Sequence, residues 1–479
     1  MAQGLRTFLS DIEANFPGDT VRVEREVEPR FEPPAFIVRL ERQGRFPVVF
    51  FEQVRGSELP VVMNVHAQRR YLAAALGVDE QDFLEEYIRR ETARIPPVMV
   101  ETGPVKEFIQ RGEDVDVTAL PVITHNALDD APYITMGVAI TKNPVTGKRN
   151  VGLYRNRLIA RNRIGLYYSW GKHIQYFHKA REEEGRPLDV AIVIGMHPAL
   201  YMGSQSIRSA AWDEDECELV GGLLGEPLEL VKCETVDLEV PAQAEIVIEG
   251  RLLPEVRSRE GPFGEYSGYY GQEVDVPEVE VTAVTRRADA IYEDCATGAS
   301  EHVLLAAAPL EGSLLRQLRT VAPTVSQVHI PSAGVLYLAF VSMKKVNEGD
   351  AKNVLLTALG MNHFLTLAVA VDEDVNVFDP RQVLWAVATR TQGDKDIFVV
   401  PYARGNRLDP MTYNTVRNQR DGMVTKVGID ATQPIDLPYE LPKRLSNPLV
   451  DLVDLGDVHS WKGLEEALRA RLEMPQRSR

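Results

Sequence analysis

Cysteine is scarce in this sequence. Only Cys217, Cys233 and Cys295 occur among 479 residues, an odd number that includes no C-x-x-C pair. This pattern argues against a disulfide framework or a thiolate zinc site, and it favours a reducing compartment. Long apolar runs are also missing, since no stretch approaches the ~18 consecutive apolar residues of a membrane span. The first residues lack the basic and apolar regions of a secretory signal. We therefore expect a cytoplasmic protein with no membrane span.

Familiar nucleotide-binding and hydrolase motifs are absent as well. The sequence contains no G-x-G-x-x-G, G-x-x-x-x-G-K-[ST], H-E-x-x-H or G-x-S-x-G. Dinucleotide-binding, triphosphate-binding, zinc-protease and esterase functions therefore lose support.

The sequence has fewer basic than acidic residues. It contains 53 lysines and arginines and 70 aspartates and glutamates, for a formal net charge of −17. Such a surface repels phosphate backbones, so we expect no nucleic-acid partner.

The length of 479 residues predicts about two to four domains, and local patterns divide the chain into three parts. Residues 1–110 mix helices and strands, which predicts an α/β region. The prolines of Ile95-Pro96-Pro97-Val98 interrupt the helical pattern near its end. The predicted helices are Leu5–Phe16, Tyr71–Leu76 and Phe83–Ala93, and the predicted strands are Val48–Phe51 and Pro60–Met63.

The other two parts differ in their elements. Residues 111–310 are rich in β-branched runs bounded by turns, which predicts a β-barrel or sandwich with inserted helices. Residues 311–479 alternate helices and strands, which predicts an α/β domain with a charged terminal helix. The predicted strands are Ile134–Ile140, Ala191–Ile194, Ala244–Ile248, Val279–Val284, Val335–Val341 and Leu365–Val371, and the predicted helices are Leu314–Val321, Asn353–Leu359, Arg381–Val387 and Trp461–Leu472.

Two glutamates stand five positions apart in Glu260-Gly261-Pro262-Phe263-Gly264-Glu265. A straight strand would point them to opposite faces. The glycines and the proline permit a tight bend that brings both side chains to one cavity. Paired carboxylates in one cavity can hold different protonation states, as acid–base catalysis requires. Taken alone, the segment is more often a surface turn with two solvated glutamates.

An arginine follows a predicted hairpin turn in Asn150-Val151-Gly152-Leu153-Tyr154-Arg155. The turn signal is Asn143-Pro144-Val145-Thr146-Gly147, so Asn150–Leu158 is predicted as the second strand of the hairpin. Arg155 can hold a carboxylate through two parallel hydrogen bonds, although in isolation an ordinary surface arginine is the commoner interpretation. A regular strand would separate Asn150 from Arg155, and only a bulge or curvature would change that.

Two further segments contain candidate metal ligands. His173 lies in Trp170-Gly171-Lys172-His173-Ile174, where a histidine beside aromatic residues is more often a structural hydrogen-bonding residue than a ligand. Glu216 lies in the segment from Asp215 to Gly222, whose acids are typical of a charged helix start that complements the helix dipole. Neither segment is decisive alone.

The joint order and spacing of these segments resemble one family, the UbiD decarboxylases. That family carries N-x-G-x-Y-R, a histidine in G-[QK]-H-I, a glutamate before a glycine-rich stretch, and E-G-P-[FY]-G-[ED]. The similarity is specific for the family and not for the substrate, and it covers residues from about 115 to about 435 clearly. The matching segments are Asn150–Arg155, Gly171–Ile174, Glu216 before Gly221, Val231–Gly250, Glu260–Glu265, Asp374–Val377, Leu384–Ala386 and Lys426–Thr432.

The resemblance implies that prenylated FMN binds to a central split β-barrel domain through a metal ion at the cofactor phosphate. The implied metal ligands are Asn150, His173 and Glu216, a mixed amide, imidazole and carboxylate set that suits Mn²⁺ or Mg²⁺. A K⁺ ion nearby is implied, with Glu216 and Ser206 as ligands. The cofactor-binding residues that it implies, besides these four, are Leu153, Tyr154, Arg155 and Lys172.

The implied catalytic residues are Arg155, Glu260 and Glu265. Arg155 would hold the substrate carboxylate, Glu260 would orient Arg155, and Glu265 would protonate carbon after carbon dioxide leaves. The reaction would be the reversible, non-oxidative decarboxylation of an aromatic, heteroaromatic or α,β-unsaturated acid. One departure concerns a lysine that some members place near the cofactor phosphate. Residues 359–363 contain no lysine, which leaves that contact open between His363 and another basic residue.

The resemblance also implies partners: a homodimer formed through the C-terminal domain, and a flavin prenyltransferase that supplies the cofactor. The substrate is a small carboxylic acid that the sequence does not identify, and His302 either approaches it or has a structural role. Decarboxylation of an aryl-CoA thioester and carboxylation in vivo are alternatives. A non-catalytic flavin-binding protein or a flavin reductase is an alternative of another class. The retained Arg155, Glu260 and Glu265 count against it, since flavin binding needs none of them.

Overall fold

The computed structural model describes residues 4–169, 171–206, 212–413, 422–435 and 444–445. The chain divides into two units at residue 433, and every element described below belongs to the first, Met1–Gln433. The predicted helix Trp461–Leu472 lies outside the described residues, as does Trp170.

The N-terminal region contains a four-stranded sheet in the order β1-β2-β3-β16. Alternate residues of β2 pack into two separate clusters: Val48 and Phe50 lie with the apolar residues of α1, and Val49 and Phe51 lie with Ile37 of α2. This strand therefore reads as a continuous apolar run because both of its faces are buried. The bounds are β1 (Thr20–Val27), β2 (Val48–Val54), β3 (Val61–Met63), β16 (Tyr292–Glu293), α1 (Leu5–Asn15), α2 (Glu32–Glu41), α3 (Arg69–Ala75) and α4 (Phe83–Thr92), which confirms the helices and strands predicted in this region.

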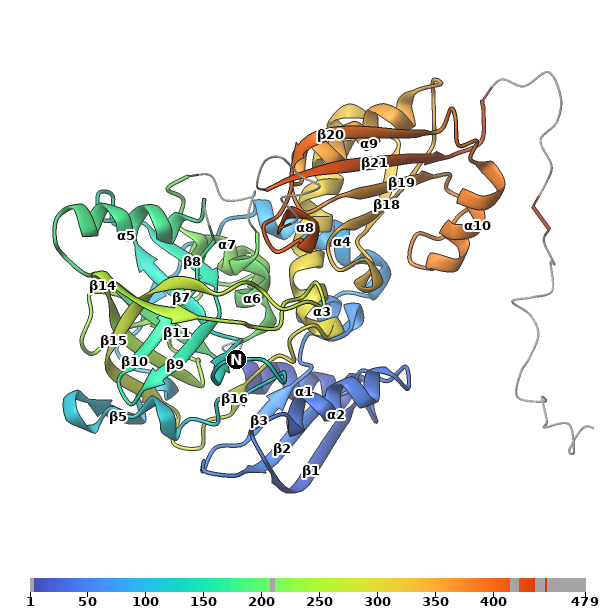
Figure 1. Ribbon diagram of the computed structural model, residues 1–479. Coiled ribbons are helices and arrows are strands. Elements are labelled where there is room, and N and C mark those ends of the chain that lie inside the picture. The colour runs from blue at the N-terminus through green and yellow to red at the C-terminus, as the bar shows by residue number, and fades with distance from the viewer. Residues whose placement is uncertain (1–3, 170, 207–211, 414–421, 436–443, 446–479) are drawn as a thin grey trace, which may run out of the picture. The chain divides into compact units, whose positions relative to one another are not determined.

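The central region is built on a nine-stranded, mainly antiparallel sheet (Figure 1), in the order β6-β9-β10-β15-β14-β11-β7-β8, with β5 paired to β15. Among the described residues no pair joins β6 to β8, so barrel closure stays a prediction. The bounds are β5 (Phe108–Arg111), β6 (Tyr133–Ile134), β7 (Val138–Lys142), β8 (Arg149–Leu153), β9 (Asn156–Ala160), β10 (Arg163–Leu166), β11 (Leu188–Ile194), β14 (Ile246–Glu260) and β15 (Val274–Arg286).

The predicted strand Ile134–Ile140 is in fact two strands, β6 and β7, so the prediction of one continuous strand was wrong. The two strands pair with different neighbours, β6 with β9 and β7 with β8 and β11. Gly137 lies at the break, and the amide of Asn156 lies 2.6 Å from where a Cβ of Gly137 would stand. Close approach of another chain segment at this glycine accompanies the change of direction.

A smaller sheet, β13-β12-β4, and three helices complete the central region. Their bounds are β4 (Val98–Met99), β12 (Glu229–Lys232), β13 (Glu239–Pro241), α5 (His173–Glu183), α6 (Pro198–Ser204) and α7 (Glu216–Leu224). The N-termini of α5 and α7 matter most for the site, because each begins at a candidate metal ligand.

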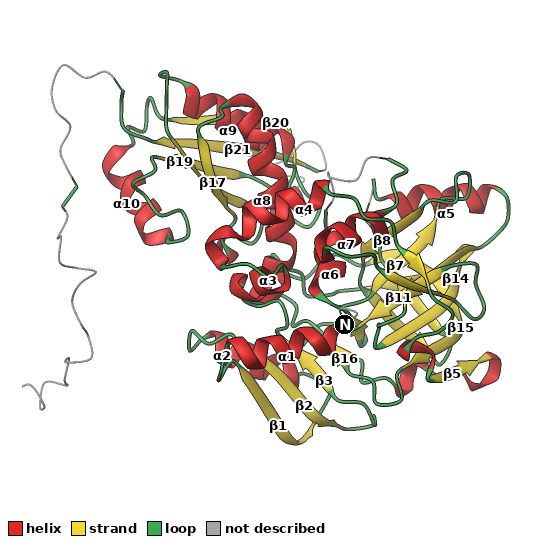
Figure 2. Cartoon of the chain, turned by 180° about the vertical axis from the view of Figure 1, so that it is seen from behind, coloured by secondary structure: helices red, strands yellow, loops and turns green. Residues whose placement is uncertain are grey.

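The C-terminal region is a five-stranded sheet with helices (Figure 2), in the order β17-β18-β19-β21-β20. β18, β19 and β21 are parallel, as the predicted alternation of helices and strands requires. The predicted strand Val335–Val341 begins only at Leu338, because Val335 and Leu336 have φ values of 43° and 72°. The bounds are β17 (Val325–His329), β18 (Leu338–Met343), β19 (Leu367–Val371), β20 (Ile397–Arg404), β21 (Met423–Ala431), α8 (Ser300–Val321), α9 (Asp350–Met361) and α10 (Pro380–Arg390).

None of the helices among the described residues is long and apolar enough to cross a membrane.

Candidate active site

A break between two strands positions Arg155. The predicted hairpin is confirmed, since β7 and β8 are antiparallel and Thr141 pairs with Asn150. The predicted continuous strand Asn150–Leu158 is wrong: β8 ends at Leu153 and β9 begins at Asn156. The two strands pair with different neighbours, so the chain turns at Tyr154 and Arg155. This turn frees Arg155 from the alternation of a regular strand.

The segment from Glu260 to Glu265 is buried, so the interpretation as a solvated surface turn is wrong. Glu260 is the last residue of β14 and is 1% exposed, and Glu265 is 5% exposed. Gly261 has a φ of +94°, a backbone conformation that glycine tolerates best, and the chain bends sharply there. The bend brings both glutamates to one partner, Arg155.

Arg155 connects the two glutamates. Its Nε and Nη2 donate to Glu260 at 2.7 and 2.9 Å, and its Nη1 donates to Glu265 Oε1. The guanidinium lies over two aromatic rings, with its central carbon 3.9 Å from the centroid of Tyr167 and 4.8 Å from that of Phe263. The ion pairs and cation–π contacts together stabilise an arginine whose side chain is only 9% exposed, and they fix its plane. The predicted catalytic trio is therefore brought together in space.

A loop that sequence reasoning missed supports this arrangement. Asp129 Oδ1 accepts from Gly264 N at 2.9 Å, and Asp129 Oδ2 accepts from Asn126 N at 2.7 Å. Asn126 Nδ2 donates to Thr297 Oγ1 at 2.7 Å. The turn-forming composition of residues 125–130 was a signal that the loop is fixed by its own side chains. The long-range contact to Gly264 had no local signal.

His302 lies close to this group. Its Nδ1 accepts from Gly298 N at 3.2 Å, and its ring meets that of Tyr266 edge-on at 5.9 Å. Burial of its ring, with the charges of His125 and Arg155 nearby, lowers the pKa of His302 to about 4. The ring is therefore neutral near pH 7, with one nitrogen in a structural hydrogen bond.

The three predicted metal ligands also converge. Asn150 Nδ2 donates to Glu216 Oε1 at 2.9 Å and lies 3.5 Å from His173 Nδ1, which in turn lies 3.5 Å from Glu216 Oε1. Asn150 comes from β8, whereas His173 and Glu216 are the first residues of α5 and α7. Adjacent ligands of an octahedral Mg²⁺ with bonds of ~2.0–2.1 Å are separated by about 3 Å. The three side chains lie close enough together to contact one ion, with Asn150 contributing its Oδ1.

Asn150 supplies a second test of this fit. Its Oδ1 is buried and has no hydrogen-bond partner. A buried carbonyl oxygen without a partner is costly, and a cation would satisfy it. Within the described residues no group of three or more His, Cys, Asp or Glu side chains is placed to hold a metal ion. A metal site here would therefore need the amide oxygen of Asn150 besides His173 and Glu216.

Family models match this chain in three consecutive segments. The N-terminal, Rift-related and C-terminal domains of 3-octaprenyl-4-hydroxybenzoate carboxy-lyase match residues 14–91, 98–300 and 303–431. The anhydromevalonate phosphate decarboxylase of Methanothermobacter thermautotrophicus is 35% identical over 432 residues, which are 90% of this chain and 97% of that protein. The chain belongs to the UbiD family.

Solved structures agree with UbiD membership. The UbiD-class enzyme HmfF from Pelotomaculum thermopropionicum, in complex with FMN, has a TM-score of 0.88 and 42% identity, and covers 95% of this chain and 99% of its own. The 3,4-dihydroxybenzoic acid decarboxylase of Klebsiella pneumoniae has a TM-score of 0.85 and 28% identity, and covers 93% and 98%. The predicted family and the predicted enzyme class, a carboxy-lyase, are therefore confirmed.

The remaining residues implied by UbiD membership lie at different places. Leu153 ends β8, and the buried ring of Tyr154 lies against Gly152. Lys172 is half-buried just before α5, and desolvation lowers its pKa to about 8. Ser206 contacts the Tyr87 hydroxyl and donates to Met202 O at 3.1 Å, and no hydrogen bond within the described chain joins it to Glu216. Glu216 and Ser206 as ligands of a K⁺ ion therefore remain a prediction.

The stretch that lacks the family lysine is reached by a lysine from elsewhere. Lys426 of β21 is 3% exposed, and its ammonium donates to Leu359 O at 2.6 Å and to Asn362 O at 2.8 Å. These carbonyls lie at the C-terminal end of α9, where the helix dipole stabilises a cation. A residue distant in sequence thus brings positive charge to this stretch.

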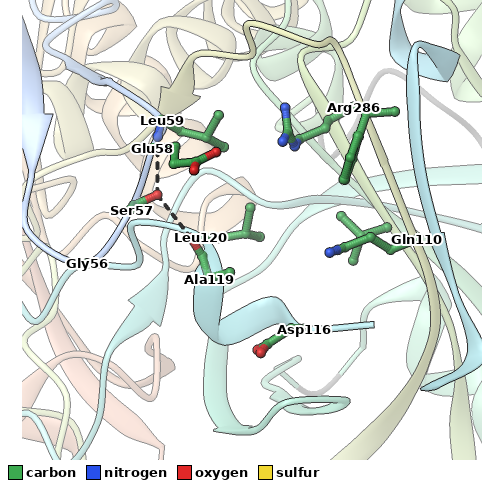
Figure 3. Close-up of a pocket in the computed structure, with 11 residues that line it drawn as sticks. Gly56, Ser57, Glu58, Leu59, Gln110, Asp116, Ala119, Leu120 and Arg286 are labelled. Atoms are coloured by element: carbon green, nitrogen blue, oxygen red, sulfur yellow. Dashed lines mark hydrogen bonds between the residues drawn. The ribbon is translucent and has the colours of Figure 1, made fainter. Parts of the chain in front are cut away.

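A cavity of roughly 520 Å³ lies apart from these residues (Figure 3). None of the predicted catalytic, cofactor or metal residues lines it. Its lining combines residues 56–59 with residues of β5 and β15 and with the segment from Asp116 to Leu120. The cavity therefore has no part in the candidate active site.

Proposed function

We propose that this chain decarboxylates an aromatic, heteroaromatic or α,β-unsaturated carboxylic acid with the aid of prenylated FMN. The observation that carries the proposal is the buried guanidinium of Arg155, held between Glu260 and Glu265. An arginine in this setting binds a carboxylate, and an adjacent carboxyl group can donate a proton. A flavin-binding protein without catalysis, or a flavin reductase, needs neither.

The cofactor assignment follows from the chemistry and from the UbiD relatives. Loss of carbon dioxide leaves electrons on an sp² carbon, and amino-acid side chains provide no sink for them. Prenylated FMN supplies that sink when bound. Two solved HmfF structures contain FMN and prenylated FMN. Asn150, His173 and Glu216 would hold Mn²⁺ or Mg²⁺ at the cofactor phosphate, and Glu216 with Ser206 would contribute to a K⁺ site.

The contacts of Arg155, Glu260 and Glu265 support a different role for each. Glu260 would keep its two contacts with Arg155 and so fix the guanidinium plane. The single contact between Glu265 and Arg155 Nη1 would be replaced when substrate binds. Nη1 would then donate to the substrate carboxylate, and the Glu265 carboxyl group could donate its proton to the carbon that loses carbon dioxide. A bound acid would bring three carboxylates to one guanidinium. Burial of uncompensated negative charge is costly, which favours a proton on one of the three groups. We assign that proton to Glu265.

The substrate is proposed only as a class. Relatives are named for anhydromevalonate phosphate, 3,4-dihydroxybenzoic acid and vanillic acid, which span unsaturated and aromatic acids. These three acids and a panel of heteroaromatic and acrylic acids form the first assay. Carboxylation, tested with bicarbonate and the decarboxylated products, addresses the reverse direction. Aryl-CoA thioesters complete the panel.

The decisive experiment compares two preparations of the chain, one expressed alone and one expressed with a flavin prenyltransferase. We expect carbon dioxide release only from the second. Equal activity of both preparations contradicts the cofactor assignment. Oxidation of a nicotinamide without carbon dioxide release would favour the reductase alternative instead.

We also propose a homodimer formed through the C-terminal domain, within a division into residues 1–110, 111–310 and 311–479. A solved HmfF structure is described as an evolved dimeric form. Among the described residues, strand β20 pairs with β21 alone. It exposes Val399 and Tyr402 by 61% and 66%, and α10 exposes Leu384 by 64%. Apolar side chains on an edge strand are typical of a surface that another chain covers. Light scattering that shows a monomer at micromolar concentration contradicts this proposal.

A further inference from the structure

We propose that the ion pair between Arg149 and Asp215 positions the ligands of the divalent-metal site. The inference rests on the proposed function, because it assumes that Asn150 and Glu216 hold a metal ion. Arg149 precedes Asn150 in the sequence and Asp215 precedes Glu216. The ion pair therefore runs beside the pair of ligands and links the same two chain segments.

The contacts of the ion pair are short and partly buried. Arg149 Nε and Nη2 donate to Asp215 Oδ2 at 2.8 and 2.6 Å, and the two side chains are 18% and 7% exposed. Asp215 Oδ1 accepts from Cys217 N at 3.0 Å, which caps the N-terminus of α7. Asp215 thus fixes both the start of the helix and its distance from β8. Glu216, as the first residue of α7, takes its place from these contacts.

The ligand pair is connected in the same way. Asn150 Nδ2 donates to Glu216 Oε1 at 2.9 Å, and Val151 N donates to Glu216 Oε2 at 3.2 Å. These contacts involve the ligands themselves, and binding of a metal would replace at least the first. The contacts of Arg149 and Asp215 involve no ligand atom and would persist. The contacts between Arg149 and Asp215 can therefore keep Asn150 and Glu216 at a fixed distance before a metal ion binds.

The preceding hairpin turn strengthens the connection. Asn143 Nδ2 donates to Asp213 Oδ1 at 2.7 Å, and the Thr146 hydroxyl contacts the same carboxylate. Arg149 Nη1 also donates to Glu239 at 3.0 Å, outside the segment that enters α7. The hairpin is therefore joined to this segment at Asp213 and Asp215 as well as at Glu216, and Glu239 offers a control within the same network.

Charge supplies a second reason for the arginine. Asp215 and Glu216 are adjacent carboxylates, both buried. Without Arg149 their repulsion would move Glu216 away from Asn150. Positioning groups of this kind typically change metal affinity by about 10–100-fold, because ligand geometry must be held to within a fraction of an ångström.

The test is Mn²⁺ binding to the cofactor-free, full-length chain, measured by the electron paramagnetic resonance signal of the free ion. Asp215→Asn keeps an oxygen for the helix cap and removes the charge. We expect it to weaken Mn²⁺ affinity by about 10–100-fold. Removing one partner of a partly buried ion pair also lowers stability, so the thermal midpoint of the metal-free variant must stay above the temperature of the binding measurement. Arg149→Met should act alike, and Arg149→Lys should restore part of the affinity. Glu239→Gln, the control, should bind as wild type.

Asn150→Ala separates failure of this inference from failure of the metal site. If Asn150→Ala loses Mn²⁺ and Asp215→Asn binds it as wild type does, the ion pair does not position the ligands. If Asn150→Ala itself binds Mn²⁺ normally, the ligand assignment under the proposed function is wrong and this inference falls with it. If Glu239→Gln weakens binding as much as Asp215→Asn, the effect belongs to the whole ionic network, and the specific role of Asp215 is refuted.

Discussion

Glu260 holds Arg155 through both carboxylate oxygens, at 2.7 Å to Nε and 2.9 Å to Nη2. Glu265 contacts the same guanidinium only through Nη1. The two acids therefore differ in how firmly they are bound, although both lie in one short segment. An anchored acid is suited to orientation, whereas an acid with one contact is suited to exchange it for substrate.

Arg155→Lys tests whether the planar guanidinium matters. Lysine keeps the charge but loses the paired hydrogen bonds and the planar contacts with the rings of Tyr167 and Phe263. We expect the Michaelis constant to rise and turnover to fall, each by at least about tenfold, a loss of ~1.4 kcal/mol apiece. Steady-state kinetics with cofactor-loaded enzyme measures both. Arg157→Lys, on the next strand, is the control and should leave both values unchanged.

His173→Ala and Glu216→Ala test the proposed metal site from two different helices. Each would remove one ligand of a shared ion, so we expect bound manganese and bound flavin to fall together. Elemental analysis and flavin absorbance measure the two quantities in the same sample. Glu218→Ala, two positions along α7 from Glu216, is the matched control. Full metal and flavin occupancy in both ligand variants would show that the assignment is wrong.

Sequence patterns predicted some parts of this site better than others. The bend between Glu260 and Glu265 was foreseeable, because glycine and proline act within the segment itself. The turn that frees Arg155 was not, because β8 and β9 part only through their separate pairings with β7, β6 and β10. A local pattern records the preference of a segment and not the neighbours that override it.

The same limit applies to the supporting structure. The ring of His125 lies 2.6 Å from Asp294 Oδ1, and these residues are far apart in the sequence. Neither has a local pattern that points to the other. Of the residues in α8, only Leu314–Val321 was predicted as helix, yet the helix begins at Ser300 and continues through Pro309. Proline weakens a local helical signal, whereas burial on both sides of Pro309 favours the longer helix.

Glu293→Gln should change how stability depends on pH. Glu293 is buried, and desolvation raises its pKa from 4.5 to about 7, against the opposing effects of His66 and of the Tyr201 hydroxyl at 2.6 Å. Between those values the folded chain holds a proton that the unfolded chain has lost. The contribution of this group is therefore fully present below about pH 4.5 and is lost as pH rises to about 7. Glutamine does not titrate.

We expect the unfolding free energy of wild type to fall by on the order of 2–3 kcal/mol more than that of Glu293→Gln when the pH rises from about 5 to about 8. Urea unfolding at the two pH values measures the difference. Glu24→Gln, at an exposed position on β1, is the control and should show no such change. A variant whose stability follows that of wild type at both pH values would show that Glu293 does not titrate in this range.

Glu265→Gln addresses the proposed chemistry most directly. Glutamine preserves the size of the side chain and can still accept from Arg155 Nη1, so we expect cofactor content and substrate affinity to remain near wild type. It cannot donate a proton to carbon at the required moment, and general acid catalysis typically contributes about 10²–10⁴-fold. Turnover should fall by at least that range, because product cannot leave before the carbon is protonated. Glu273→Gln, an exposed residue of the same hairpin, should retain full turnover. If Glu265→Gln keeps a tenth or more of wild-type turnover, another group donates the proton, and Glu260 is the next candidate. At least one of the two hydrogen bonds between Glu260 and Arg155 would then have to break during the reaction.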